Sequence, residues 1–281
     1  MNGIIVIDKE NGYTSFDVVA KMRRICGEKK IGHTGTLDPM ATGVLPILIG
    51  NATKAQSLLP ESDKEYEATF SFGITTDTLD ITGKVLSQTE SNVKSEDLET
   101  VLPQFRGDIM QLPPMYSAVS KDGVRLYELA RKGLVTEREA RPITVYKLDL
   151  LNFDEQLQSA KILVKCSKGT YIRTLCENIA EEMQTVGYMK ELNRTRVGDF
   201  YIENSITIEQ LEQSQYQIIT IEQFFKDEEF INLTEKGLKL FLNGVQLTYH
   251  LVDGIYRIYQ DDKFIGIGTI KNELLKRDII I

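Results

Sequence analysis

The sequence contains no tryptophan, only two histidines and only three cysteines. The cysteines form no CxxC pair, so they predict reduced thiols in small core positions rather than a disulfide framework. His33 and His250 lie far apart, which argues against a His-rich metal site. No apolar run approaches the roughly 20 residues that cross a bilayer, and the opening apolar run is too short for a signal peptide. We expect a cytoplasmic protein without a membrane partner.

The formal net charge is −8, but the charge is unevenly distributed over the 281 residues. Lys and Arg outnumber Asp and Glu in three blocks, which are residues 1–60, 104–147 and 161–200. A phosphate-binding face built from these blocks is compatible with the acidic total, so net charge does not exclude a nucleic-acid partner. The length predicts one large domain and a small one.

The loop 32–45 contains three glycines, one proline and one carboxylate between strand-like apolar runs. The glycines permit tight turns, and Pro39 biases Asp38 toward an extended backbone. A rigid loop of this kind can present a single acid. Taken alone, however, Asp38 is better interpreted as a structural Asp-Pro turn that accepts local backbone hydrogen bonds.

The first 75 residues show clear periodicity. Thr14 or Ser15 is predicted to cap a helix whose apolar stripe is Phe16, Val19, Met22 or Arg23, and Cys26, with Gly27 at its C-terminal end. Apolar runs predict strands at Gly3–Ile7 and Val44–Ile49. Residues 64–73 alternate, which places Tyr66 on one face with Ala68, Phe70 and Phe72 and favours a core aromatic over a catalytic phenol.

Later segments combine proline turns with spaced cations. Residues 111–118 form a proline-rich loop followed by Lys121 and Arg125, which suits either an RNA-binding loop or a packed surface loop. A helix is predicted from Tyr171 to about Met183, on which Arg173 points away from the apolar stripe: it is either a solvated arginine or the partner of a carboxylate. The polar turn 75–80 predicts no chemistry. After residue 230, short Gly-punctuated strands predict a small β-barrel-like domain rather than an extension of the main sheet.

These residues together resemble the TruB family of tRNA pseudouridine synthases. The resemblance rests on an ordered set of motifs between residues 3 and 200: Asp8-Lys9, Gly12-Tyr13-Thr14-Ser15, the twelve residues 32–43, Ala52-Thr53-Lys54, Lys64-Glu65-Tyr66, the eight residues 111–118, and Gly169-Thr170-Tyr171-Ile172-Arg173. The C-terminal segment is similar to a short PUA-type domain. Any one motif could occur by chance, but the ordered set is highly specific.

The resemblance implies a fold and a division of the chain. The expected fold is α/β (α+β), with a large mixed, mainly antiparallel sheet and a small C-terminal PUA-like β domain. The catalytic domain would span residues 1–230, with an RNA-binding insertion at 104–147, and the PUA-like domain residues 231–281.

The resemblance also implies a reaction: conversion of uridine to pseudouridine at position 55 in the T loop of tRNA, by a monomeric enzyme that flips the base and needs no cofactor or metal. A carboxylate can act as a covalent nucleophile at C1′ of the ribose or at C6 of the ring, and the sequence leaves this choice open. Asp38 would be this nucleophile, and Arg173 would pair with it and lower its pKa.

Other roles follow from the same resemblance. Tyr66 would stack on the flipped uracil and help to remove the C5 proton. His33 would either fill the vacated space or contact the neighbouring nucleotides. The remaining expected residues are Tyr171, Leu192 and Lys54 at the uridine pocket and, as weaker RNA contacts, Lys9, Lys121, Arg125 and Arg194.

Two departures and two alternatives accompany this hypothesis. The family usually has Lys-Pro at Lys9-Glu10, and two arginines where this chain has Asn193-Arg194, which could loosen the entry turn and shift a phosphate contact. One alternative is a guide-RNA-dependent synthase of the dyskerin type. The other is an RNA-binding or RNA-folding module in which catalysis is secondary. Residues 104–125 could order only on RNA.

Overall fold

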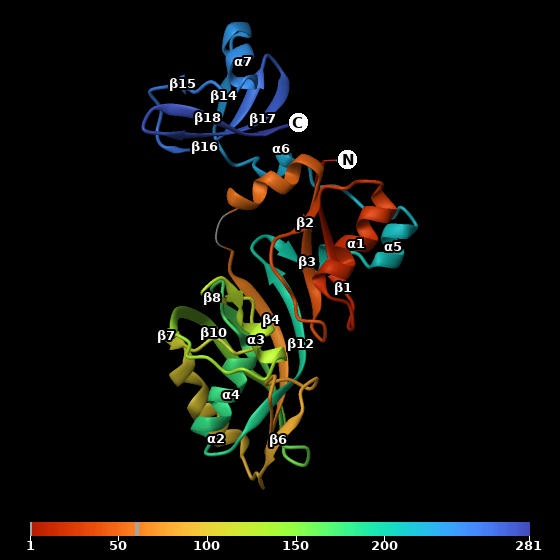
Figure 1. Cartoon of the computed structure of the whole chain (residues 1–281), viewed down its shortest axis with the longest axis vertical. Coiled ribbons are helices and arrows are strands. Elements are labelled where there is room, and N and C mark those ends of the chain that lie inside the picture. The colour runs from red at the N-terminus through yellow and green to blue at the C-terminus, as the bar shows by residue number, and fades with distance from the viewer. Residues whose placement is uncertain (1, 60–61) are drawn as a thin grey trace. The chain divides into compact units, whose positions relative to one another are not determined.

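A computed structural model describes residues 2–59 and 62–281 of the chain. Contacts divide the protein into two compact units. Unit 1 comprises Met1–Pro39, Val44–Pro60 and Glu203–Ile281, and unit 2 comprises Met40–Gly43 and Glu61–Ile202. The chain therefore leaves unit 1 and returns to it twice (Figure 1). In the described part, no helix is long and apolar enough to cross a membrane.

The N-terminal part of unit 1 combines a short sheet with one helix. Its elements are β1 (Gly3–Lys9), α1 (Ser15–Cys26), β2 (Ile31–His33), β3 (Thr42–Ile49) and the 3-10 helix η1 (Gly50–Ser57). β2 pairs antiparallel with β3, which also lies beside β1. The predicted caps of α1 are confirmed: Thr14 forms a capping box, and Gly27 is left-handed with φ of 62°.

The predicted buried stripe of α1 is partly wrong. The helix buries Ser15, Val18, Val19 and Met22, whereas Phe16 is 65% exposed. Because the buried face is centred on positions 15, 18, 19 and 22, the side chain at position 16 projects from the solvent face.

Unit 2 is organised around a mainly antiparallel sheet, as predicted. The strand order is β12-β4-β11-β10-β7, and these strands are Gly187–Val197, Lys64–Phe72, Ser159–Cys166, Arg141–Asp154 and Gly107–Gln111. The two residues at the start of β3, Thr42 and Gly43, pair parallel with Asn193 and Arg194, which makes the sheet mixed. The alternation expected for β4 is present, since Tyr66, Ala68 and Phe70 are all buried.

Helices and hairpins complete unit 2. α4 (Ile172–Glu182) packs against β12 and β4. The remaining elements are α2 (Ser95–Val101), η2 (Leu102–Phe105), α3 (Leu126–Arg131), β13 (Phe200–Tyr201) and the hairpins β5–β6 (Ile74–Thr76, Val85–Gln88) and β8–β9 (Ser120–Lys121, Val124–Arg125). The β8–β9 hairpin and α3 lie within the predicted insertion 104–147.

The C-terminal segment of unit 1 begins with η3 (Ile202–Asn204), α5 (Ile208–Glu212) and α6 (Ile221–Phe224). A five-stranded sheet follows, in the order β14-β16-β17-β18-β15. Its strands are Phe230–Asn232, Gly254–Gln260, Lys263–Lys271, Leu274–Ile280 and Leu247–Thr248, accompanied by α7 (Glu235–Leu242). The small β domain is thus confirmed. It has its own core around Phe241 and Ile258, both fully buried. We keep the boundary at residue 231, which falls within β14, as a proposal.

Candidate active site

The backbone around Asp38 is fixed on both sides. On the N-terminal side, the hydroxyl of Ser15 accepts a hydrogen bond from the Leu37 N–H at 2.9 Å and donates to the Leu37 carbonyl at 3.2 Å. The Leu37 side chain is buried as well. On the C-terminal side, the Pro39 carbonyl accepts from the Gly12 N–H at 2.9 Å. Asp38 itself is half-buried, so its carboxylate is presented from a held backbone.

The side chain of Lys9 provides a further anchor for the same loop. Its ammonium donates to the carbonyls of Glu10 at 2.9 Å, Tyr13 at 2.6 Å and Pro39 at 3.2 Å. Its exposed fraction is 0%. A buried ammonium satisfied by three carbonyls is not available to a phosphate, so the expected RNA contact of Lys9 is not retained. Lys9 instead ties the entry turn to the residue after Asp38.

The end of the loop approaches another backbone too closely for any side chain. Gly43 has φ of +98°, and a Cβ at this position would lie 2.3 Å from the carbonyl oxygen of Arg194. The neighbouring Asn193 accepts a hydrogen bond from the Thr42 hydroxyl at 3.2 Å. Asn193, the second departure from the family pattern, therefore stabilises the contact between the loop end and β12.

Arg173 is buried in unit 2 and pairs with an acid that the sequence did not single out. Its Nη1 lies 3.3 Å from a carboxylate oxygen of Asp80, and both side chains are 5% exposed. The guanidinium also donates to the carbonyls of Thr78 and Tyr116, each at 2.9 Å. The interpretation of Arg173 as a solvated helix arginine is wrong, because the turn 76–82 and the loop containing Tyr116 cover it.

Asp80 is itself held by three donors besides Arg173. Its Oδ1 accepts from the hydroxyl of Thr78 at 2.8 Å and from the N–H and hydroxyl of Thr82 at 2.9 and 2.6 Å. In the sequence, Asp80 is distinguished only by a threonine two residues before it and another two residues after it. The sequence did not indicate a role for Asp80 because the polar side chains of such a turn usually form hydrogen bonds only within the turn.

Gln111 fixes the start of α4. Its side-chain carbonyl accepts from the Tyr171 N–H at 2.8 Å, and its amide donates to the Tyr171 carbonyl at 3.0 Å. The proline-rich motif that Gln111 opens also supplies the Tyr116 carbonyl bound by Arg173. The motif thus positions both Tyr171 and Arg173, a role that sequence reasoning did not assign to it.

Tyr66 and Arg194 lie opposite each other on β4 and β12. Both are buried, and Arg194 is 1% exposed. Burial lowers the pKa of Arg194, while the hydrogen-bonded phenol of Tyr66 opposes that shift. Burial, together with the charge of Arg194, also lowers the pKa of Lys64. The expected RNA contact of Arg194 is therefore not retained, since its guanidinium is buried in the sheet and hydrogen-bonds the phenol of Tyr66. Leu192, two residues earlier, is also buried.

Comparison with known proteins places this arrangement in a family. Residues 23–172 match the model of the TruB family pseudouridylate synthase N-terminal domain. Residues 173–231 match the tRNA pseudouridylate synthase B C-terminal domain. The chain belongs to the TruB family. This confirms the resemblance inferred from the motifs.

Two curated relatives and one solved structure show how far the similarity extends. The chain is 46% identical to tRNA pseudouridine synthase B of Clostridium novyi and 44% identical to that of Clostridium tetani, in each case over 98% of this chain and 98% of the relative. A solved H/ACA RNP bound to a substrate RNA containing 2′-deoxyuridine is similar with a TM-score of 0.70 and 22% identity, covering 99% of this chain and 85% of that chain. At that identity, the structural match shows the fold alone.

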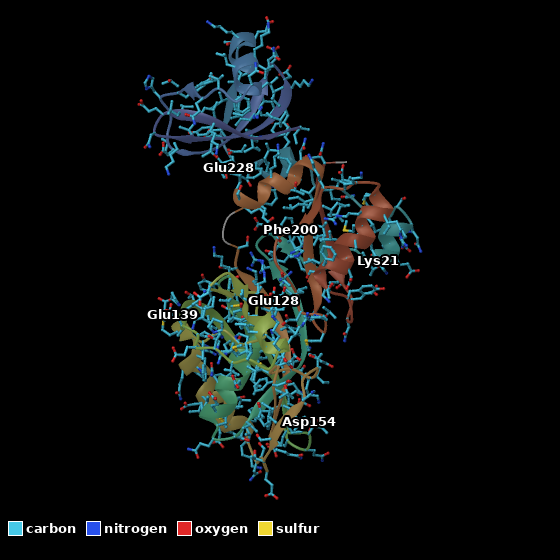
Figure 2. The ribbon with its side chains drawn as sticks, viewed as in Figure 1. Lys21, Glu128, Glu139, Asp154, Phe200 and Glu228 are labelled. Carbon is cyan, nitrogen blue, oxygen red and sulfur yellow. The ribbon has the colours of Figure 1, made fainter. Side chains whose placement is uncertain are left out.

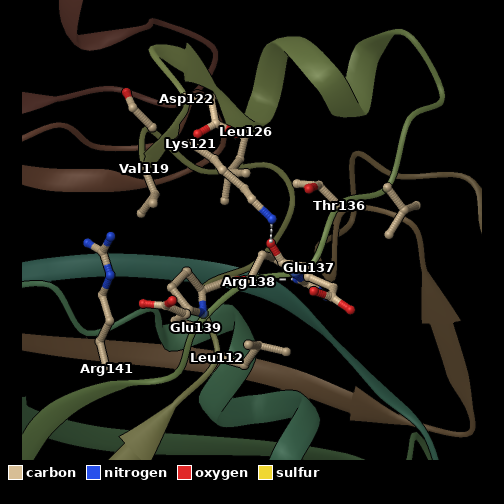
Figure 3. A pocket seen from close by; sticks show the side chains of 13 residues that line it. Leu112, Val119, Lys121, Asp122, Leu126, Thr136, Glu137, Arg138, Glu139 and Arg141 are labelled. Carbon is tan, nitrogen blue, oxygen red and sulfur yellow. Dashed lines mark hydrogen bonds between the residues drawn. The ribbon is translucent and has the colours of Figure 1, made fainter.

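Three further expected cations of this TruB family chain are exposed: Lys54, expected at the uridine pocket, and Lys121 and Arg125, expected as RNA contacts. Lys54 is exposed on η1 in unit 1. In unit 2, Lys121 donates to the Glu137 carbonyl at 2.9 Å and Arg125 to the Ala118 carbonyl at 3.1 Å. Lys121 lies at a cavity of about 840 Å³ between the β8–β9 hairpin and the segment 134–141, where Figure 3 shows its bond to Glu137.

The expected site residues are divided between the two units of this TruB family chain. Unit 1 contains Asp38, His33 and Lys54, together with the buried Lys9. Unit 2 contains the remaining expected residues, which are Tyr66, Lys121, Arg125, Tyr171, Arg173, Leu192 and Arg194. In the described residues, no group of three or more His, Cys, Asp or Glu side chains could hold a metal ion.

Proposed function

We propose that this protein isomerises uridine to pseudouridine at position 55 in the T loop of tRNA, with Asp38 as the covalent nucleophile. The observation that carries the proposal is the clamped backbone of Leu37 and Pro39, which presents one half-buried carboxylate in a chain of the TruB family. The names of the two curated relatives, tRNA pseudouridine synthase B, support the choice of substrate.

The reaction breaks the N1–C1′ bond and forms a C5–C1′ bond, and the C5 proton is replaced by one on N1. Product and substrate are isomers, so a carboxylate that attacks and then leaves is sufficient for this balance. Attack by Asp38 at C1′ or at C6 fulfils it equally well. The uracil must leave the RNA stack first, at a cost of a few kcal/mol.

We infer that Arg173 stabilises the ionised form of Asp38, since a nearby guanidinium favours a carboxylate. Asp80 is then a positioning residue, because its ion pair at 3.3 Å holds the guanidinium. In the same proposal, Tyr66 stacks on the uracil, with Arg194 orienting its phenol. Tyr171 and Leu192 line the uridine pocket, and His33 fills the vacated space.

The peripheral roles remain proposals of the same kind. Lys54 supports the site, and Lys121 and Arg125 contact RNA phosphates after giving up the carbonyls of Glu137 and Ala118. The protein acts as a monomer in the cytoplasm.

The test is the variant Asp38→Asn, which keeps the shape of the side chain and removes its charge. Purified protein is incubated with a tRNA transcript, and pseudouridine is mapped by mass spectrometry. We expect wild-type protein to convert position 55, and Asp38→Asn to form no product. Asp262→Asn, at an exposed acid, is the matched control. If Asp38→Asn converts uridine at the wild-type rate, Asp38 is not the nucleophile.

The same assay separates the two alternatives. A guide-RNA-dependent enzyme would leave plain tRNA unmodified when the chain acts alone. An RNA-folding module would retain cellular function in Asp38→Asn and lose it when Lys121 and Arg125 are substituted, both of which are exposed.

A further inference from the structure

The solvent face of α1 in unit 1 combines an exposed aromatic ring with a group of cations. Phe16 is 65% exposed, and the guanidinium of Arg23 lies 5.8 Å from the centre of its ring. Positions 16 and 23 are seven residues apart, so they lie on the same face of the helix. Arg24, Lys29 and Lys30 follow immediately and are also exposed.

This face is joined to the strand that leads to Asp38. Arg23 donates to the carbonyl of Ile31 at 3.2 Å, and Ile31 opens β2. β2 ends at His33, directly before the loop that presents Asp38. Figure 1 shows α1 beside β2. The face therefore adjoins the loop within a single compact unit.

These cations differ in their partners from five cations of unit 2 that are paired with carboxylates. In unit 2, Lys94, Arg106, Lys147, Lys161 and Arg173 all form ion pairs with carboxylates. Over the described residues 2–59 and 62–281, Arg24, Lys29 and Lys30 form no such pair.

The acids close to this face, Glu28 and Asp17, accept hydrogen bonds from neutral groups and, within the described part of the chain, form no ion pair with these cations. Glu28 accepts the backbone N–H of Lys30 at 2.9 Å, and Asp17 accepts from Thr14 in the capping box. On the flank of the helix, Lys21 donates to the Tyr13 hydroxyl at 2.7 Å (Lys21 is labelled in Figure 2). The four cations at the C-terminal end of α1 outnumber Glu28, the one acid among residues 23–30, and so present a net positive surface.

We propose that Phe16, Arg23, Arg24, Lys29 and Lys30 form a second RNA-binding surface, which we call the α1 face. Phe16 stacks on an unpaired base, and the cations bind the phosphates on either side of that base. An exposed ring offers a base a sequence-tolerant platform, and adjacent cations follow the backbone. A negatively charged protein segment would fit the cations but would leave the ring without a stacking partner. The inference rests on the proposed function, because it assigns this surface to the same RNA substrate.

The experiment measures binding of a full-length tRNA transcript to the whole protein at several salt concentrations. We expect Phe16→Ala to weaken binding about 10-fold, as loss of one stacked base does. Phe16→Tyr should bind like wild type because the ring is retained. The double variant Arg24→Gln/Lys29→Gln should lower the slope of log Kd against log salt by about 1.5, since about 0.7 to 0.9 is lost per phosphate contact. The turnover rate at saturating tRNA should not change in any of these variants.

Matched controls remove comparable groups elsewhere. Leu157→Ala deletes a side chain that is 66% exposed, and Lys94→Gln removes a cation that is paired with Glu155. Both should bind tRNA like wild type. If Phe16→Ala is folded and binds tRNA as tightly as wild type while wild type forms pseudouridine, the α1 face is refuted and the proposed function stands. If wild type forms no pseudouridine but binding still depends on Phe16, the proposed function fails and the α1 face stands.

Discussion

Each unit contains a buried cation among its expected site residues, Lys9 in unit 1 and Arg173 in unit 2, and the surroundings of the two cations differ. In unit 1, the ammonium of Lys9 is surrounded by the carbonyls of Glu10, Tyr13 and Pro39. In unit 2, the guanidinium of Arg173 binds two carbonyls and the carboxylate of Asp80. Carbonyls satisfy a buried cation and fix the backbone. A carboxylate also compensates the charge, so removal of either partner leaves the other charge buried.

Of the substitutions at these two buried cations, Arg173→Met should have the larger effect. This change leaves the Asp80 carboxylate without its cation at 5% exposure, and we expect a loss of about 3–5 kcal/mol in the free energy of unfolding. Urea denaturation followed by circular dichroism measures it. Arg173→Met combined with Asp80→Leu should recover part of the loss, because no charge is then left buried. A loss below about 1 kcal/mol in the single variant would contradict the importance of the pair.

Lys9→Met should cost less, about 1.5–3 kcal/mol, because three carbonyls lose a hydrogen-bond donor. The same urea titration applies, with the exposed Lys263→Met as control. Since Lys9 also holds Pro39, we expect lower pseudouridine formation at temperatures where the variant is still folded. A variant of wild-type stability would show that the three hydrogen bonds contribute little.

The smallest effect concerns Glu177, one turn after Arg173 on α4. Burial, reinforced by the charge of Glu181, raises the pKa of Glu177 from 4.5 to about 7, with Arg138 opposing the shift. The folded state therefore binds more protons than the unfolded state between pH 4.5 and 7, and stability decreases as pH rises through that window. Because the side chain is half-exposed, the loss is about 1 kcal/mol after solvent screening.

Glu177→Gln should therefore be more stable than wild type at pH 8 and equal to it at pH 4. Thermal melts across this pH range measure the difference. A constant difference at both pH values would mean that packing rather than ionisation distinguishes the two side chains.

The sequence predicted the parts of this molecule that depend on local pattern. Capping preferences predicted Thr14 and Gly27 at the two ends of α1, and the two-residue period of a strand predicted the alternating burial through Tyr66. The structure confirms both predictions. The ordered motifs also indicated the family, which the matches over residues 23–172 and 173–231 establish. Family motifs retain information that propensity does not contain.

What the sequence could not predict depends on distant partners. Arg173 meets Asp80, 93 positions earlier, and no local pattern couples an arginine on a helix to an acid in a hairpin turn. Lys9 and Arg194 are charged and were expected to face RNA, yet both are buried because polar groups from other segments satisfy them. Phe16 shows the converse, since its apolar side chain is exposed.

The closed loop around Asp38 has a consequence for the order of folding. Its anchors are local: Ser15 and Leu37 are 22 positions apart, Lys9 and Pro39 are 30 positions apart, and His33 pairs with Ile47. The bond from Thr42 to Asn193 instead spans 151 positions. Since short loops close at lower entropic cost, the loop around Asp38 can acquire its shape before β12 adds to the sheet. We therefore expect the backbone that carries Asp38 to be positioned by contacts within residues 9–47, before β12 comes to lie against Gly43.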